Sequence, residues 1–239
     1  MKPAERRYLA LEPLIAVPYY TLVRKELEKL ARQNGPGFTI LDVGGRESPY
    51  TTGVQAEVTI TDLPRESEVQ HKLGLGVTAA VIEKVQQNRS NIKQVIFDDM
   101  TRTQITDTYD AVVAVEVLEH VPEDELFVQN VSRVLKPGGI FIMTTPNGHA
   151  VSNTNPDHQR HYRREQLHEL LTRHFDSVDV HFAVRKNAIQ YVAYRSARRF
   201  WPAAPLIFVC RLLNHYQSMR ESNKTQSANT CNLVAIARK

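Results

Sequence analysis

Short apolar runs alternate with amphipathic segments along most of this chain of 239 residues, and this alternation constrains the fold more than any other feature. Seven runs are typical of buried strands, because they are short, rich in β-branched residues and bounded by turn residues. They are FTILDVGG, AEVTITDLP, NIKQVIFDDM, DAVVAVEVL, GIFIMTTPN, SVDVHFAV and CNLVAIARK. Helical spacing lies between several of them, as in VTAAVIEKVQQN, EDELFVQNVSRVL and REQLHELLTRHF. Strands that alternate with helices favour a doubly wound, mostly parallel α/β sheet.

Two parts of the chain fall outside this alternation. Residues 1–37 carry helical spacing that Pro13 and Pro18 interrupt, followed by TLVRKELEKLARQ as an amphipathic helix. Residues 185–228 form a basic, aromatic stretch before the last run. Because no internal linker separates these parts, we expect a single domain. It would consist of an N-terminal helical cap (1–37), a core (38–184), a helical insertion (185–228) and a last strand (229–239).

Composition excludes several classes of protein. Apolar residues make up 42% and charged residues 23%, which are globular values and exclude disordered and fibrous chains. The two cysteines, Cys210 and Cys231, are too few for a disulfide framework and indicate a reducing compartment. Glu5, Glu12 and Pro13 interrupt any signal-peptide core, and no run reaches the length of a spanning helix. The expectation is a soluble, cytoplasmic protein.

Acids and glycines stand where the predicted strands end. The first strand ends in Asp-Val-Gly-Gly at 42–45, the second in Asp62, the third in two aspartates at 98–99, and the fourth leads into EVLEH at 116–120. Ligands of such sheets bind beyond the carboxyl ends of the strands. Glycine lets the backbone approach a ligand closely, and an acid about 20 residues further on can accept from both hydroxyls of a ribose.

Six strings in order together resemble the class I S-adenosylmethionine-dependent methyltransferases: ILDVGG, TITDLP, FDDM, YDAVVAVEVLEHV, LKPGGIFIMTTPN and DHQRHYRREQL. EVLEHV followed by LKPGG and TTPN is most similar to the small-molecule O-methyltransferase branch, which includes quinone, sugar and lipid-headgroup enzymes. The resemblance implies a Rossmann-like sheet of seven strands with a reversed last strand, which CNLVAIARK fits. It also implies a cofactor-binding core, S-adenosylmethionine as cofactor, S-adenosylhomocysteine as product, and no metal.

The resemblance also implies roles for particular residues. Gly44 and Gly45 would line the methionine portion of the cofactor, Asp62 would hold the ribose, and Asp99 would meet the adenine amine. The full predicted cofactor set is Asp42, Gly44, Gly45, Arg46, Asp62, Leu63, Asp99, Met100, Val115 and Glu116. The loop departs from the family's Asp-x-Gly-x-Gly-x-Gly pattern, because Arg46 and Ser48 replace the later glycines. Arg46 either pairs with the cofactor carboxylate or points to solvent.

A hydroxyl acceptor must lose its proton during methyl transfer, so the sequence should contain a base. His120, just past the fourth strand, is the first candidate, and His161 is the second. An alternative role for His120 is to support Glu116 and Glu119. Residues after the fifth strand lie on the rim where a substrate should enter; the predicted substrate residues are Asn147, His158, Arg160 and Tyr162. His158 and His161 lack the Glu or Cys companions of a metal site, so no metal is expected.

Basic charge is concentrated between Arg185 and Arg220, where seven cations occur without an acid. The rest of the chain has 23 basic and 26 acidic residues, so a nucleic-acid footprint over the whole protein is not indicated. Aromatic side chains alternate with these cations. Three interpretations remain open for the stretch: it lies on an anionic membrane, it caps the substrate pocket, or it packs as a helical pair on the sheet edge.

The leading hypothesis is a methyltransferase that moves a methyl group to an oxygen of a small or lipid-linked acceptor. Its location would be the cytoplasm, with peripheral contact at the inner face of an anionic membrane. One alternative is a cofactor-binding regulatory module without turnover. Another is an RNA or protein methyltransferase that docks through the basic stretch, although nucleic acid is the less favoured partner.

Overall fold

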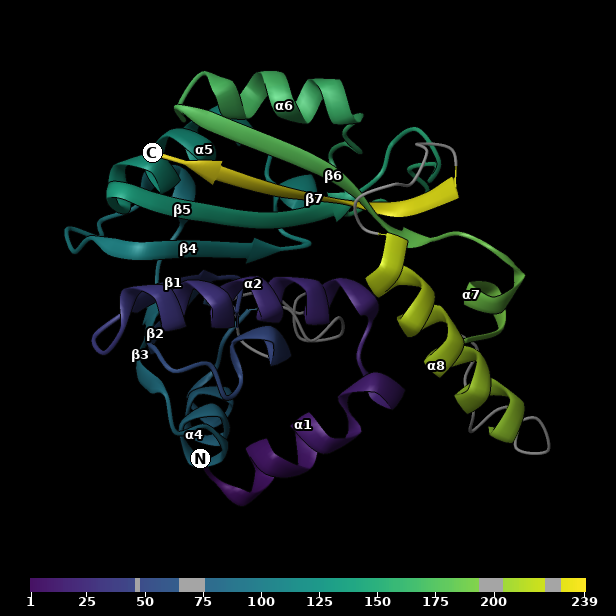
Figure 1. The fold of residues 1–239 in the computed structure, drawn as a ribbon. Helices are drawn as coiled ribbons and strands as arrows, with labels where there is room; N and C mark the ends of the chain where they lie inside the picture. Colours follow the sequence, from purple (N-terminus) through teal and green to yellow (C-terminus); the bar gives the residue numbers. More distant parts are fainter. Residues whose placement is uncertain (46–47, 65–75, 194–203, 222–228) are drawn as a thin grey trace.

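A seven-stranded sheet forms the centre of the protein in the computed structural model, which describes residues 1–45, 48–64, 76–193, 204–221 and 229–239 (Figure 1). The strand order is β3-β2-β1-β4-β5-β7-β6. The strands are β1 Thr39–Val43, β2 Glu57–Asp62, β3 Ile92–Phe97, β4 Tyr109–Val115, β5 Leu135–Pro146, β6 Ser177–Arg185 and β7 Thr230–Arg238. The first five pair in parallel, whereas β7 runs antiparallel to both β5 and β6. The predicted fold, including the reversed last strand, is confirmed.

Helices cover both faces of the sheet, because side chains of successive strand residues point to opposite faces. On one face, α2 (Pro18–Asn34) and α4 (Ala79–Asn88) pack over a core that includes Ile40 and Val113. On the other face, α5 (Asp124–Val134) and α6 (Arg164–Thr172) pack over a core that includes Leu41 and Val112. The strands of the parallel part are therefore buried on both sides, which explains their nearly continuous apolar sequences.

The N-terminal helices differ in one detail from the prediction. Helix α1 spans Pro3–Ile15, so Pro13 lies in its last turn, and the break comes only between Ile15 and Pro18. A proline so close to the end of a helix removes one hydrogen bond without ending the helix earlier. Pro18 begins α2, where its missing N–H would have had no helical partner.

The described part of the predicted insertion holds two helices, α7 (Ala188–Ala193) and α8 (Ala204–Glu221). Helix α8 packs against α7, α1, α2 and β6. Figure 1 shows both helices on the side of the molecule toward which β4 and β5 point. None of the described helices is long and apolar enough to cross a membrane.

Single 3-10 turns follow three of the parallel strands. They are η1 (Pro49–Thr51) after β1, η2 (Met100–Arg102) after β3 and η3 (Leu118–His120) after β4. All three lie beyond the carboxyl ends of their strands, at the edge where α/β sheets bind ligands. Each turn contributes side chains to this edge, among them Tyr50, Thr101 and His120.

Candidate functional site

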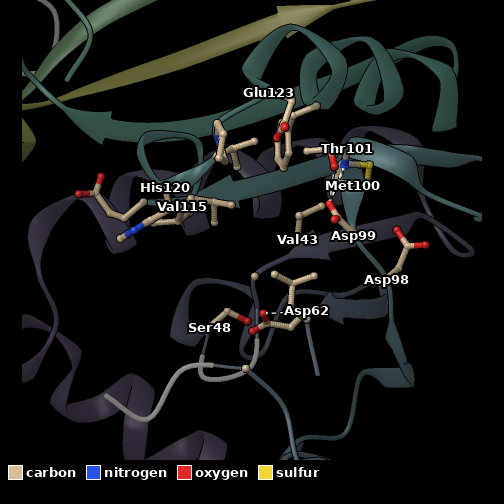
Figure 2. Close-up of a pocket in the computed structure, with 18 of the residues that line it drawn as sticks. Val43, Ser48, Asp62, Asp98, Asp99, Met100, Thr101, Val115, His120 and Glu123 are labelled. Carbon is tan, nitrogen blue, oxygen red and sulfur yellow. Dashed lines mark hydrogen bonds between the residues drawn. The ribbon is translucent and has the colours of Figure 1, made fainter. Parts of the chain in front are cut away.

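A cavity of about 510 Å³ opens at the carboxyl ends of β1 to β4, on both sides of the point where the strand order reverses. This volume is typical of small-molecule sites. In Figure 2, Asp62, Asp99, Val115 and His120 lie around the same space. The residues that line it are Tyr20, Val43, Gly44, Ser48, Pro49, Tyr50, Asp62, Leu63, Gly76, Asp98, Asp99, Met100, Thr101, Val115, Glu116, Val117, His120, Val121, Pro122, Glu123 and Phe127.

Gly44 brings bare backbone to the cavity wall. Its φ is +72°, and its N–H donates to the carbonyl of Thr61 at 2.7 Å. A Cβ at this position would lie 2.8 Å from Cγ2 of Val117. Both the left-handed backbone and the lack of space therefore require glycine here.

Asp42 lies behind the loop rather than in the cavity wall. Its fully buried carboxylate accepts from the hydroxyls of Tyr50 (2.8 Å), Thr51 (3.0 Å) and Ser48. A Cβ on Gly45 would overlap with this carboxylate. Asp42 and Gly45 thus shape the loop that Gly44 presents to the cavity, which differs from the direct ligand contact that was expected. Arg46, the other predicted loop residue, lies outside the described residues.

Arg89 completes the support of this loop, and no local pattern in the sequence indicates it. Its guanidinium donates to the carbonyl of Ser48 at 3.1 Å and to the hydroxyl of Thr51. The side chain is buried, and burial lowers the pKa of Arg89 while the charge of Asp42 opposes that shift. Burial also raises the pKa of Asp42 to about 6, against the hydrogen bonds that favour its charged form. Ser48, which replaces a glycine of the family pattern, takes part in this network through its hydroxyl and its carbonyl.

Asp62 occupies the predicted position at the end of β2. One of its carboxylate oxygens, Oδ1, accepts from the backbone N–H of Leu63 at 2.8 Å, which orients the side chain. Both residues line the cavity, and Leu63 is 45% exposed, so an apolar surface lies beside the carboxylate. This combination suits a ligand that carries vicinal hydroxyls next to a flat ring.

The two aspartates after β3 both line the cavity but have different partners. Asp99 accepts from the N–H (2.9 Å) and hydroxyl (2.8 Å) of Thr101, and from Nε of Arg102 at 3.1 Å. A carboxylate has about four acceptor positions, so one remains for a ligand. Asp98 accepts from the N–H of Gln104 at 3.0 Å, and its buried Oδ2 has no partner among the described residues. Asp98 Oδ2 is thus a second oxygen that could accept from a ligand here. The predicted contact of Asp99 with the adenine amine therefore stays a prediction.

Glu116 follows β4 with a φ of +55°, a left-handed conformation that is uncommon for a residue with a side chain. Three hydrogen bonds hold its carboxylate: one from the hydroxyl of Thr144 (2.7 Å) and two from the amide of Asn232 (3.1 Å each). Burial raises the pKa of Glu116 to about 7. Strained backbone of this kind is concentrated at ligand sites. Asn232 lies 116 positions away in β7, so sequence reasoning missed it.

Val115 and Met100 give the cavity apolar walls beside Glu116 and Asp99, their neighbours in the chain. Both side chains are buried and both line the cavity. Their predicted contact with the cofactor stays a prediction. Tyr20 of α2 also lines the cavity, and sequence reasoning did not include it.

His120 is exposed at the end of η3 and lines the cavity. Its Nδ1 lies 3.0 Å from the carbonyl oxygen of Asp157. Because a carbonyl only accepts, Nδ1 carries the hydrogen, and Nε2 of the neutral ring holds a lone pair. By the same reasoning Nδ1 of His161 donates to the carbonyl of Val151 (3.0 Å), and its Nε2 accepts from Nδ1 of His158 (2.7 Å). His161 therefore supports His158, whose ring centroid lies 4.5 Å from that of His120.

Glu119, His120 and His158 are the residues that could hold a metal ion within the described part of the chain. One carboxylate oxygen and one nitrogen of each ring lie within 4.8 Å of one another. Glu119 is buried, and burial together with the charge of Glu116 raises its pKa well above the ordinary value. Sequence reasoning considered His158 with His161 and found no acid beside that pair, because Glu119 lies 39 positions before His158 in the chain. The expectation that no metal is needed stays a prediction.

Three of the predicted substrate residues have structural partners instead. Asn147 is fully buried, and its amide donates to the carbonyl and hydroxyl of Thr230 at 3.1 Å each. The hydroxyl of Tyr162 donates to Asp124 at 2.6 Å, and Arg160 forms an ion pair with the same carboxylate at 2.5 Å. None of the three lines the cavity, and neither does His158. The segment after β5 thus bonds to β7 through Asn147 and to α5 through Arg160 and Tyr162, which explains the difference from the expectation.

Comparison with known proteins identifies the domain. The family model described as "Methyltransferase domain" matches residues 18–191. A ubiquinone biosynthesis O-methyltransferase from Xanthomonas oryzae pv. oryzae (strain PXO99A) is 34% identical over 121 residues, which cover 49% of this chain and 46% of that protein. The match thus spans about half the length of this curated relative.

Solved structures share the fold at low sequence identity. An S-adenosylmethionine-dependent methyltransferase from Archaeoglobus fulgidus superposes with a TM-score of 0.58 at 15% identity, covering 98% of this chain and 99% of that one. A phosphoethanolamine N-methyltransferase 2 from Haemonchus contortus, in complex with S-adenosyl-L-methionine, gives 0.59 at 14% identity, with coverages of 98% and 60%. The similar proteins therefore include both O- and N-methyltransferases.

Proposed function

The chain belongs to the class I S-adenosylmethionine-dependent methyltransferases, and from that premise we propose that it transfers a methyl group to an oxygen of a small or lipid-linked acceptor. The observation that carries the proposal is the position of His120. It lies in the wall of the cavity at the end of β4, with the lone pair of Nε2 not used by its hydrogen bond to Asp157.

The cavity residues fit the cofactor. When bound, S-adenosylmethionine supplies an electrophilic methyl group on a sulfonium sulfur. Gly44 would leave room for the methionine portion, Asp62 would accept from the ribose hydroxyls, and the remaining acceptor position of Asp99 would meet the adenine amine. Leu63 and Met100 provide apolar surface for the ring.

The chain's own contribution to the reaction is alignment and proton removal. Methyl transfer is an in-line displacement, for which holding the two reactants in line gives much of the rate. As the acceptor oxygen forms its bond to carbon, its hydrogen passes to Nε2 of His120. Throughout this step Nδ1 keeps its hydrogen and donates it to the carbonyl of Asp157, which keeps the ring oriented. The exposed imidazolium then releases the proton to water.

Oxygen is preferred over nitrogen as the acceptor atom for a chemical reason. A hydroxyl at neutral pH needs a base, whereas a neutral amine can attack without one. A histidine with a free ring nitrogen in the cavity wall therefore supports a hydroxyl acceptor. The O-methyltransferase relative from Xanthomonas oryzae points the same way.

The test is transfer of labelled methyl groups from S-adenosylmethionine to water-soluble and lipid-extracted cell fractions, followed by mass spectrometry of the product. We expect a methyl ether as product. His120→Ala should lower the transfer rate by roughly 10² to 10⁴ while cofactor affinity, measured by calorimetry, changes less than about twofold. His168→Ala, an exposed histidine of α6, is the matched control and should keep full activity. A methyl group on nitrogen or carbon, or full activity of His120→Ala, would contradict the proposal.

A further inference from the structure

Helix α8 presents a continuous apolar face to the outside of the protein. Six of the thirteen large hydrophobic side chains that are exposed among the described residues lie on this one helix, at 40% to 58% exposure. This α8 apolar face consists of Leu206, Phe208, Val209, Leu212, Leu213 and Tyr216. Single exposed hydrophobic residues are ordinary, but a patch of this kind marks an interaction site.

The inward side of the same helix is unusually polar. Ile207 and Cys210 are buried near its start, but Asn214 and Ser218 are buried further along. The Asn214 amide makes a long contact of 3.4 Å to the carbonyl of Arg185, and neither its Oδ1 nor the Ser218 hydroxyl has a partner among the described residues. Hydrophobic burial within this chain would favour the opposite rotation of the helix. An apolar partner outside the protein would account for this orientation.

Helix α8 lies on the side of the molecule toward which β4 and β5 point, which is also the side of the cavity (Figure 1). The guanidinium of Arg211 joins α8 to its neighbours, donating to the carbonyls of Ala193 in α7 (2.8 Å) and Leu14 in α1 (3.3 Å). Helix α8 also packs against α2, whose Tyr20 lines the cavity. A surface that touches α8 is thus close to the edge of the sheet where an acceptor enters.

Two occupants could cover the α8 apolar face, a second copy of this chain or a lipid surface, and the charge of the surrounding sequence favours the lipid surface. Between Arg185 and Arg220 the sequence holds seven cations and no acid, and the next acid is Glu221. Three of the cations, Arg195, Arg198 and Arg199, precede α8 in a segment outside the described residues. In a symmetric pair of chains the same stretch would face itself, so like charges would meet without acids to compensate them. An anionic lipid surface offers both the opposite charge and an apolar layer.

We propose that α8 lies flat on an anionic membrane, with its apolar face at the boundary between headgroups and acyl chains. A helix with one apolar face and nearby cations binds membranes in this way, and Tyr216 is suited to the headgroup level. This inference rests on the proposed function: the methyl acceptor is an amphiphilic molecule that reaches the cavity from the membrane. Of the two acceptor classes proposed above, small and lipid-linked, the membrane position of α8 favours the lipid-linked class.

Sedimentation with vesicles tests the proposal on the full chain, without acceptor or cofactor. Vesicles of phosphatidylcholine and phosphatidylglycerol at 3:1 are compared with pure phosphatidylcholine at low and high salt. We expect at least tenfold stronger partitioning to the anionic vesicles, falling at high salt. The variant Leu206→Gln, Val209→Gln, Leu213→Gln should lose at least tenfold. Leu126→Gln, which changes an exposed leucine of α5, should bind as the wild type does.

Cofactor binding by calorimetry verifies that each variant is folded, and Val209→Gln alone serves if the triple variant does not fold. Wild-type protein that stays in the supernatant overturns the proposal, as does equal binding of the wild type and the triple variant. A dimer in analytical ultracentrifugation that the triple variant abolishes, without vesicle binding, assigns the face to a second copy instead. Vesicle binding needs no turnover. A failed methyl-transfer assay would therefore contradict the proposed function without changing the result of the vesicle experiment.

Discussion

Asp62→Ala is expected to weaken binding of S-adenosylhomocysteine by tenfold to a hundredfold without unfolding the protein. Asp62 lies at the end of β2 in the cavity wall, and the N–H of Leu63 orients its carboxylate. In the proposed complex this carboxylate accepts from both ribose hydroxyls of the cofactor. Alanine removes both bonds and leaves the ribose to water.

The magnitude follows from the partial exposure of the side chain. Hydrogen bonds to charged groups contribute about 1.5 to 3 kcal/mol each. Asp62 is only half-buried, so water competes for both bonds, and their joint contribution should not exceed twice the low end of that range, about 3 kcal/mol. A loss of about 1.5 to 3 kcal/mol corresponds to tenfold to a hundredfold in affinity. The loss of the local bond to Leu63 should cost the folded protein about 1 kcal/mol, which is too little to unfold the domain.

Titration calorimetry measures the affinity, and thermal unfolding without ligand measures stability. Asp62→Asn keeps an acceptor for Leu63 but loses the charge and one acceptor, so its affinity should fall between those of wild type and Asp62→Ala. Glu57→Gln is the matched control, because Glu57 begins the same strand with a carboxylate that is 53% exposed and pairs with Lys93. Cofactor affinity of Asp62→Ala within twofold of wild type would refute the ribose assignment.

Other predictions concern the groups behind the cavity. Gly45→Ala would force its Cβ into the carboxylate of Asp42, so we expect a lower melting temperature and weaker cofactor binding, measured by thermal shift and calorimetry. Asp42 has its pKa raised to about 6 in the folded state, so folding takes up a proton and the contribution of this group falls as pH rises from about 4 to 6. Relative to Asp42→Asn, the wild type should therefore lose about 1 kcal/mol between pH 5 and 7 in urea titrations, and a constant difference would contradict this. Asn232→Ala removes both amide bonds to Glu116 and should destabilise the protein by about 1 to 3 kcal/mol in the same titrations, whereas wild-type stability would show that the bonds contribute little.

The strands and their ends were predictable from the sequence because their signals are local. A run such as TILDV is apolar over most of its length, which marks a strand covered on both faces. Parallel strands also end at one edge of the sheet, so Gly44, Asp62, Asp99 and Glu116 had to lie near one another. The position of the cavity at this edge could therefore be predicted from the sequence alone.

The direction of each polar side chain at that edge was not predictable. Asp42 and Asp62 both lie at the ends of apolar strands, yet one carboxylate is enclosed by hydroxyls while the other lines the cavity. Asn147 and Tyr162 lie near the expected rim, but their polar atoms have partners in β7 and α5. Whether a polar atom faces a ligand or its own fold depends on partners that are distant in the chain.

The α/β class, the order of the elements and the edge of the sheet where a ligand binds all follow from the order of residues, since apolar periodicity and the residues that end a strand are local signals. Three other features emerge only once the chain is folded: Arg89 and Asn232 hold the cavity, His158 lies beside His120, and α8 turns its apolar side outward. The physical reason is common to all three. Hydrogen bonds and burial join residues through space, and contacts between residues about 40 to more than 100 positions apart leave no pattern in the neighbouring sequence.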